Sequence, residues 1–164
     1  MDRLALAHQV ASSVLDPELP LVTVAELGIL RDVALVDGRV DVVITPTYLG
    51  CPALHAIEAD LRHHLKAAGF AEVTVRVELA PPWSSEAITP SGRAKLAAAG
   101  IAPPQGRPRA AGPVPLLLTP RDPVPCPRCA STDTEQTAPF GATACKALHR
   151  CRACGEPFEY VKDI

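Results

Sequence analysis

The sequence is poor in aromatic residues, in excess charge of either sign and in long apolar runs. Aromatic residues make up 4% of the 164 residues, which argues against stacking surfaces for single-stranded nucleic acid. Lysine and arginine (16) nearly balance aspartate and glutamate (18), and the net charge of -2 favours neither a nucleic-acid partner nor an anionic membrane surface. No apolar run approaches the roughly 20 residues that span a bilayer, so no membrane association is expected.

Common enzyme motifs are also missing. The chain has no GxSxG elbow, no GxxxxGK[ST] phosphate loop and no GxGxxG after a strand-like segment. Its first ten residues, MDRLALAHQV, lack the apolar centre of a signal peptide, so a cytoplasmic protein is expected. The six cysteines should then be reduced, which favours metal binding or thiol chemistry over disulfides.

A first helix and a β-hairpin are expected near the start of the chain. Asp2 can cap a helix that runs to about Leu15. The apolar stripe of this helix should consist of Leu6, Val10 and Val14. Residues 29–36 and 39–45 read as two strands, and Asp37-Gly38 between them is a strong hairpin-turn signal.

A second helix is expected directly after Cys51. Pro52 suits the first helical position, which makes Cys51 the N-cap, and Gly69 suits the position just past the end. An N-cap cysteine faces the positive end of the helix dipole, which can lower a thiol pKa from ~8.5 into the range of ~3.5–7.5. A lone cysteine is more often a buried structural residue, so position alone leaves the role of Cys51 open.

A third strand and a third helix complete the first domain. The strand should bury Val73, Val75, Val77 and Leu79 on one face. Thr89 can cap the helix, which starts at Pro90 and ends at Gly100. The order of elements predicts an α/β fold over residues 1–102, with helices packed on one small mixed sheet in two layers.

The composition changes sharply after this domain. Nine of the 18 prolines fall between residues 103 and 127, which predicts an extended linker over residues 103–124. Its one apolar patch, PLLL at 115–118, either docks on a domain or partner or is plain linker.

Residues 125–164 carry the pattern of a small zinc-ribbon-like β module. Two CxxC pairs, separated by 21 residues, supply four thiolates at a spacing that suits one tetrahedral metal: Cys126, Cys129, Cys151 and Cys154. So short a module cannot bury a core and needs a cross-link, for which a metal is favoured over two disulfides, and the same four ligands accept zinc or an iron–sulfur cluster. Cys145 either packs in the ribbon hairpin or adds a ligand, and His149 is expected to be an exposed loop residue.

Three segments of the first domain resemble the MIP18-like (DUF59) family, whose α/β domain is associated with iron–sulfur cluster assembly. They are DPELP (16–20), ELGILRDV (26–33) and ITPTYLGCP (44–52). Two further segments narrow the similarity to the phenylacetate-degradation D family. They are PPWSSEAITPSGRAKLAAAGIAPP (81–104) and, in the ribbon, FGATACKALHRCRACGEPFEY (140–160). That family supports the phenylacetyl-CoA oxygenase, also called epoxidase.

The resemblance implies an accessory protein, and not an enzyme, that matures or delivers iron–sulfur centres to this oxygenase. Cys51 would be its reactive thiol with a transient cluster, supported by a loop of Asp16, Glu18 and Thr47. The implied partners are the oxygenase components with their iron–sulfur reductase and the assembly machinery. A cluster shared between two Cys51 thiolates would in addition suggest a homodimer. The alternative is a scaffold component of the oxygenase that carries only structural zinc. A thiol-transferase is disfavoured, because no resolving cysteine lies near Cys51.

Overall fold

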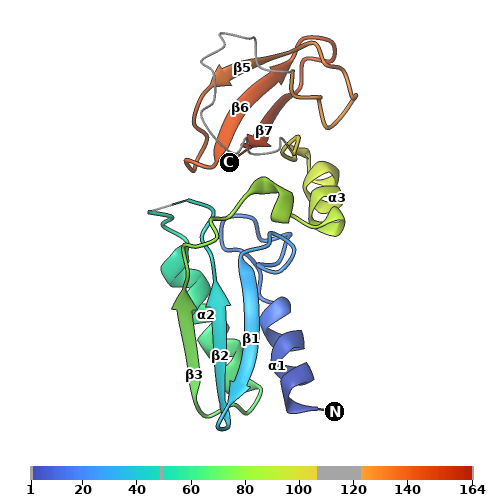
Figure 1. The fold of residues 1–164 in the computed structure, drawn as a ribbon. Coiled ribbons are helices and arrows are strands. Elements are labelled where there is room, and N and C mark those ends of the chain that lie inside the picture. Colours follow the sequence, from blue (N-terminus) through green and yellow to red (C-terminus); the bar gives the residue numbers. More distant parts are fainter. Residues whose placement is uncertain (1, 49, 107–122, 164) are drawn as a thin grey trace. The chain divides into compact units, whose positions relative to one another are not determined.

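The computed structural model describes residues 2–48, 50–106 and 123–163 (Figure 1). The chain forms two compact units, which divide between Lys95 and Leu96. Most of the predicted linker, with its PLLL patch at 115–118, lies outside the described residues. Among the described helices, none is long and apolar enough to cross a membrane.

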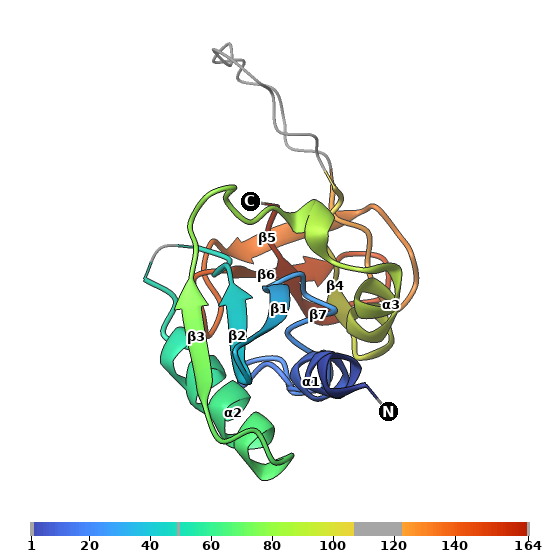
Figure 2. The same cartoon turned by 60° about the horizontal axis from the view of Figure 1, so that its bottom comes forward.

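The N-terminal unit is a two-layer α/β fold, as predicted. Its sheet has the order β1-β2-β3, with β1 antiparallel and β3 parallel to β2. Helices α1 and α2 lie side by side on one face of this sheet (Figure 1 and Figure 2). The elements of this unit are α1 (Arg3–Ser12), β1 (Leu30–Val36), β2 (Arg39–Ile44), α2 (Leu54–Ala67), β3 (Val73–Val77) and the 3₁₀ turn η1 (Ser85–Ala87). Helix α3 (Pro90–Ala98) follows, and the division between the two units falls within it.

The core lies between the sheet and the two helices. Alternate residues of β2 point into it, and α2 contributes a stripe at helical spacing. The fully buried members are Val40, Val42, Ile44, Ile57, Leu61 and Leu65. The predicted hairpin turn is confirmed, because Asp37 and Gly38 both have positive φ (51° and 83°), as a type I′ turn requires.

The expected extent and buried face of the first helix were wrong in detail. Helix α1 is capped by Asp2 but ends at Ser12, and it buries Ala7 and Ala11 rather than a stripe of Leu6 and Val10. Alanines on the buried face let this short helix approach the sheet closely.

Strand β3 ends earlier than predicted, at Val77. β2 offers no partner beyond Ile44, and the chain then enters a segment that contains Pro81 and Pro82, which lack the N–H that a ladder needs. Leu79 is therefore 52% exposed, and Val77 at the end of the strand is 37% exposed, although both were expected to be buried.

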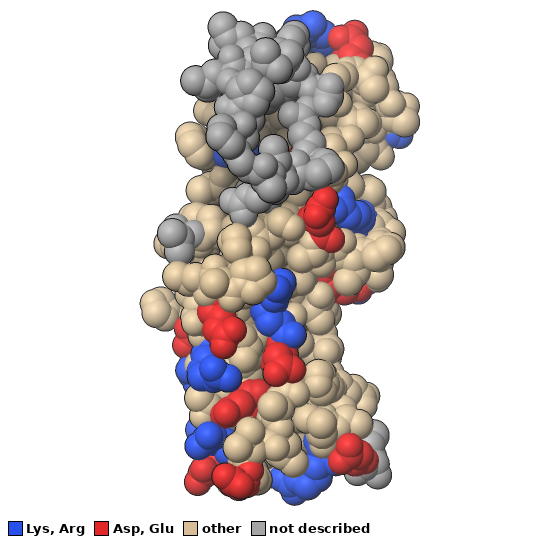
Figure 3. Space-filling model, viewed as in Figure 1, with Lys and Arg blue, Asp and Glu red and all other residues tan. Residues whose placement is uncertain are grey.

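The open face of the sheet, which faces the viewer in Figure 1, carries charges of both signs. Arg39 pairs with Asp41 at 3.0 Å on β2, and Arg76 pairs with Glu78 at 3.2 Å at the end of β3. Acidic and basic side chains are interspersed over the N-terminal unit on the face seen in Figure 3. This face therefore lacks the one-sided field that attracts a polyanion.

The C-terminal unit is a zinc-ribbon-like sheet of four strands in the order β4-β7-β6-β5. Its elements are β4 (Ile101–Ala102), β5 (Thr134–Ala138), β6 (Lys146–Cys151) and β7 (Pro157–Val161). β4 runs parallel to β7, whereas the other neighbours are antiparallel. Residues 101–102, which the sequence assigned to the first domain, thus form the edge strand of the second sheet.

The prediction that His149 is an exposed loop residue was also wrong. It is buried on β6, where its ring stacks on Phe158 with 5.6 Å between centroids and meets the Tyr160 ring edge-on at 5.4 Å. Burial lowers its pKa, and its Nδ1 atom has no hydrogen-bond partner within the described chain. The alternation of buried and exposed residues along β6 places His149 on the inner face, which a loop assignment does not anticipate.

Candidate functional site

The four ribbon cysteines converge on one point in the C-terminal unit. The Sγ atoms of Cys126, Cys129, Cys151 and Cys154 all lie within 4.8 Å of one another. Two of the separations are 3.8 Å, between Cys126 and Cys154, and 3.6 Å, between Cys129 and Cys151. Four sulfurs around one zinc ion at about 2.3 Å form a tetrahedron with edges of about 3.8 Å. The donor set accepts zinc or an iron–sulfur cluster, and the spacing fits a single ion.

The two CxxC turns, called knuckles below, share one backbone design. In each, the N–H four residues after the first cysteine donates to that cysteine's carbonyl: Ala130 to Cys126 and Gly155 to Cys151, both at 2.9 Å. In each, the first cysteine's own N–H donates to the carbonyl five residues on. Both knuckles therefore present their thiols from equivalent positions.

The thiols are too close together to ionise independently. Backbone N–H donation, first from Cys154, lowers the pKa of Cys151 to about 7. Ser131 N–H also lowers the pKa of Cys129, but the three neighbouring thiols and burial together raise it to about 12. Four thiolates in this volume need a cation between them, and a bound metal supplies it.

Two arginines tie the knuckles to acidic neighbours. Arg128, inside the first knuckle, donates to the carboxylate of Glu156, which follows the second, at 2.5 Å. Arg152, inside the second knuckle, pairs with Glu135 of β5 at 2.7 Å. These pairs are exposed, so they orient the knuckles more than they stabilise them.

Cys145 lies at the other end of β6 from the metal centre. It precedes Lys146, the first residue of β6, whereas Cys151 is the last, and six strand residues span about 20 Å. Its Sγ atom is 3.1 Å from the hydroxyl of Thr143, and its carbonyl accepts the N–H of Lys162. The structure therefore does not bring Cys145 to the four-cysteine group.

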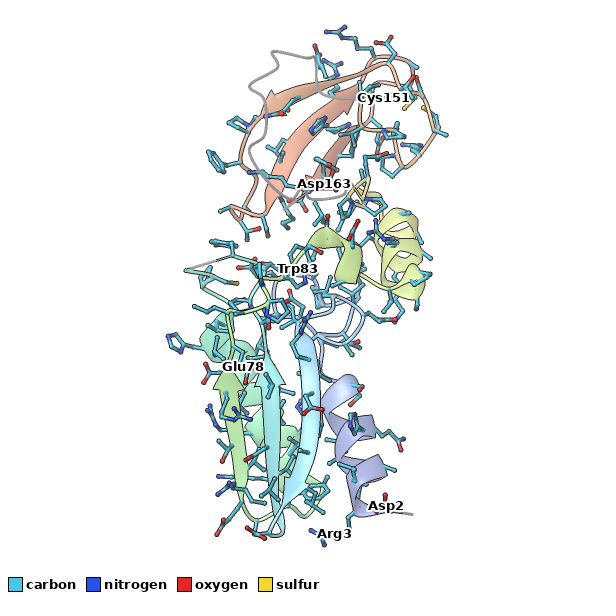
Figure 4. The ribbon with its side chains drawn as sticks, viewed as in Figure 1. Asp2, Arg3, Glu78, Trp83, Cys151 and Asp163 are labelled. Atoms are coloured by element: carbon cyan, nitrogen blue, oxygen red, sulfur yellow. The ribbon has the colours of Figure 1, made fainter. Side chains whose placement is uncertain are left out.

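The Cys51 segment lies at one end of the N-terminal sheet. The register pairs Leu30 with Ile44 and Ile44 with Val77, so the start of β1 and the ends of β2 and β3 coincide. Three segments meet there: residues 13–29, residues 45–53 as far as they are described (45–48 and 50–53), and residues 78–89 (Figure 1). The first contains the predicted acidic turn, the second contains Cys51, and the third contains Trp83, which lies beyond Glu78 at the end of β3 (Figure 4).

The N-cap prediction for Cys51 was wrong. Helix α2 begins at Leu54, and Ala53 takes the N-cap position without a side-chain cap hydrogen bond. Cys51 precedes it by one turn, since its carbonyl accepts the N–H of Leu54 at 3.3 Å. Pro52 lies in this turn instead of opening the helix. The thiol is partly exposed, and Gly50 before it has a φ of +89°.

The acidic turn adopts a self-capped geometry. Asp16 is buried, and its carboxylate accepts the N–H groups of Glu18 at 2.9 Å and Leu19 at 2.8 Å. Glu18 is half-buried, as is Thr47 in the bend that follows β2. The fold thus brings all three to the end of the sheet where Cys51 lies, and their roles there remain predictions.

Sequence reasoning missed the residue that joins the first of these segments to helix α3. Glu26 accepts the N–H of Thr23 at 3.0 Å while its own N–H donates to the Thr23 hydroxyl. The T-x-x-E spacing of this capping box is visible in the sequence and could have revealed it. Glu26 also binds Lys95 at 2.8 Å and Ser91 at 2.7 Å in α3, and these contacts lower its pKa to about 2.

Further contacts join the first segment to residues 78–89. The indole N–H of Trp83 donates to the carbonyl of Leu27 at 2.8 Å, and both residues are buried. A Cβ atom placed on Gly28 would lie 2.5 Å from Ala87. The ELG (26–28) and PPW (81–83) segments, noted separately in the sequence, are therefore packed against each other.

Comparison with known protein families gives one family match in each part of the chain. Residues 9–82 match a family described as iron–sulfur cluster assembly protein. Residues 110–162 match a family described as PaaD zinc beta ribbon domain. The first match contains Cys51 with Asp16, Glu18 and Thr47, and the second contains all four clustered cysteines.

Two individual proteins extend this result. The chain is 41% identical over 153 residues to a protein of Escherichia coli (strain K12) that is named as a component of 1,2-phenylacetyl-CoA epoxidase, and the match covers 93% of this chain and 88% of that protein. The crystal structure of a DUF59 domain from Bacillus anthracis is 28% identical with a TM-score of 0.52, and covers 57% of this chain and 90% of that one.

Proposed function

The chain belongs to the PaaD family, and we propose on this basis that it is an iron–sulfur cluster assembly or carrier factor that matures a phenylacetyl-CoA oxygenase. Cys51 holds the cluster transiently, and the ribbon, with its own metal, recognises the client. The protein is an accessory factor of the oxygenase complex and not itself the catalyst. It works in the cytoplasm, where its thiols stay reduced.

The observation that carries this proposal is the position of Cys51 at the end of the sheet. Cys51 is partly exposed, and a Cβ atom placed on Gly50 beside it would meet nothing within 4 Å. The N-terminus of α2 follows three residues later, and Ala53 at its N-cap provides no side-chain acceptor, so the positive end of the helix dipole favours an anionic ligand nearby. A cluster bound by thiolates carries negative charge, so the positive end of the α2 dipole would stabilise it beside Cys51.

A cluster at Cys51 needs thiolates from elsewhere. The first 125 residues contain no other cysteine. The remaining ligands therefore come from a second copy of the chain, from the client or from a small thiol. Incomplete coordination by the carrier favours transfer, because the client's full set of cysteines holds the cluster more firmly.

The test is activation of the oxygenase in cells. A strain without this protein is complemented with the wild-type chain, with Cys51→Ser or with Cys145→Ser, and the activity and cluster content of the oxygenase reductase are measured. Cys145 is the matched control, because it is also half-exposed and lies outside the four-cysteine group. We expect the activity and the cluster content to be lost with Cys51→Ser and to be retained with Cys145→Ser. Normal maturation with Cys51→Ser would contradict the proposal.

A second candidate is a scaffold component of the oxygenase with structural zinc alone. It is favoured by the ribbon sulfurs, whose spacing of 3.6 and 3.8 Å fits a single ion. A scaffold should co-purify with the oxygenase in fixed stoichiometry, contain zinc only and be indifferent to Cys51→Ser. A carrier should associate transiently and depend on Cys51.

A further inference from the structure

Ala102 lies in the hydrophobic cluster that contains two of the metal ligands. Its side chain is 1% exposed and packs in one group with Val124, Phe158, Cys126 and Cys151. Cys126 belongs to the first knuckle and Cys151 to the second. A residue that precedes the proline-rich stretch thus completes the apolar surroundings of both halves of the metal centre.

The segment around Ala102 is also held through its backbone. Ile101 pairs with Glu159 and Ala102 with Tyr160, so β4 covers the edge of β7 that would otherwise be open. Strand β7 begins at Pro157, three residues after the last ligand, Cys154. Docking of β4 therefore supports the strand that leads out of the second knuckle.

Asp163 fastens the end of the same segment. Its carboxylate accepts the N–H groups of Gln105 at 3.2 Å and Gly106 at 2.9 Å, and the hydroxyl of Tyr160 at 2.5 Å. Asp163 lies just past the end of β7 and is well separated from Cys151 (Figure 4). Residues 101–106 are thus held along β7 from their pairing with Glu159 to this carboxylate.

We propose that the metal module begins at Ile101, and that metal binding at the four cysteines is coupled to docking of residues 101–106. Without metal the knuckles separate, and the cluster that buries Ala102 opens. Conversely, when Ala102 leaves the cluster, water reaches the apolar surroundings of Cys126 and Cys151, and metal binding becomes weaker. The coupling is reciprocal, as linkage requires. This inference concerns the ribbon alone and does not depend on Cys51.

The first arm of the test is hydrogen exchange on the full chain, with zinc bound and after removal by a chelator under reducing conditions. We expect the amides of residues 101–106 to exchange at least about tenfold faster without metal. Strand β2 of the other unit is the internal reference and should not change. Continued protection of residues 101–106 while β6 loses its protection would overturn the proposal.

The second arm measures zinc affinity by competition with a colorimetric chelator. Ala102→Asp should bind zinc at least about tenfold more weakly, whereas the same change at the exposed Ala144 should not. Because Ala102→Asp can disrupt folding, Asp163→Asn is compared with Asp133→Asn, the same charge change at an exposed aspartate whose carboxylate lies 3.9 Å from the guanidinium of Arg152 in the second knuckle. Asp163→Asn should weaken zinc binding and speed exchange at residues 105–106. Wild-type affinity in both Ala102→Asp and Asp163→Asn would overturn the coupling.

Discussion

Ala130 and Gly155 occupy the same position in the two knuckles, and both have a left-handed backbone conformation. Their φ angles are 59° and 79°, and each donates its N–H to the carbonyl of the first cysteine of its knuckle. Glycine adopts this conformation without strain, whereas alanine does so at a cost of about 1–2 kcal/mol. The first knuckle therefore carries backbone strain that the second lacks.

Exchanging these residue types should change zinc affinity in opposite directions. Ala130→Gly removes the strain, partly offset by the greater freedom of glycine in the unfolded chain, and should tighten binding by up to about 1 kcal/mol, or fivefold. Gly155→Ala adds strain and should weaken binding by about the same factor. Chelator competition measures both, and tighter binding by Gly155→Ala would refute this account of the knuckles.

Gly28→Ala should destabilise the N-terminal unit more than a glycine change elsewhere. Gly28 has a φ of +70°, and an added Cβ would lie 2.5 Å from the Cβ and carbonyl oxygen of Ala87. Strain and overpacking together should cost about 2–4 kcal/mol. Gly38, with a φ of +83° and open space around it, is the control, and Gly38→Ala should cost only about 1–2 kcal/mol. Urea unfolding followed by the fluorescence of Trp83, the single tryptophan, measures both; equal losses would argue against the close contact.

Glu26→Gln should lower stability at neutral pH but not in acid. The folded-state pKa of Glu26 is about 2, below its ordinary value of 4.5, so its stabilising effect is present above pH 4.5 and is lost between pH 4.5 and 2. Glutamine can still accept the N–H of Thr23, so the change removes mainly the charge that pairs with Lys95, and this loss should cost about 1 kcal/mol at pH 7. The wild-type and variant urea curves should then converge as the pH approaches 2. Glu86→Gln, at an exposed glutamate, is the control, and a difference that persists in acid would contradict the assignment.

Metal removal should unfold the ribbon and leave the N-terminal unit folded. The ribbon core around Phe158 is small and includes two metal ligands, whereas the N-terminal unit has its own core. After chelation, exchange should accelerate in β6 while Trp83 fluorescence stays unchanged. Loss of the Trp83 signal on chelation would mean that the two units are not independent.

Local patterns predicted those parts of the fold that depend on a few neighbouring residues. The Asp37-Gly38 pair predicted the hairpin turn, because these residue types tolerate the positive φ that such a turn requires. The two CxxC pairs predicted the metal centre, because they provide four thiolate ligands. The start of α2 was mispredicted, because Pro52 fits a first helical position equally well in the turn that precedes the helix. Only the hydrogen bond from Leu54 to Cys51 distinguishes the two.

Contacts between residues far apart in the chain could not be predicted from local sequence patterns. Nothing in IAPP (101–104) indicates that Ala102 completes a cluster whose other members start at Val124. His149 looked like a loop residue until pairing with Phe158 placed it on the inner face of β6. Glu26 is the intermediate case, since its capping box is local but its pair with Lys95 is not.

The central claim is that Cys51 holds an iron–sulfur cluster while the ribbon holds its own metal. It is tested most directly by analysis of iron, zinc and acid-labile sulfide in anaerobically purified wild-type protein beside Cys51→Ser. The account predicts iron, sulfide and a visible chromophore in the wild type, and their loss in Cys51→Ser with the ribbon metal retained. Equal iron and sulfide in the two proteins, or zinc alone in both, would contradict it.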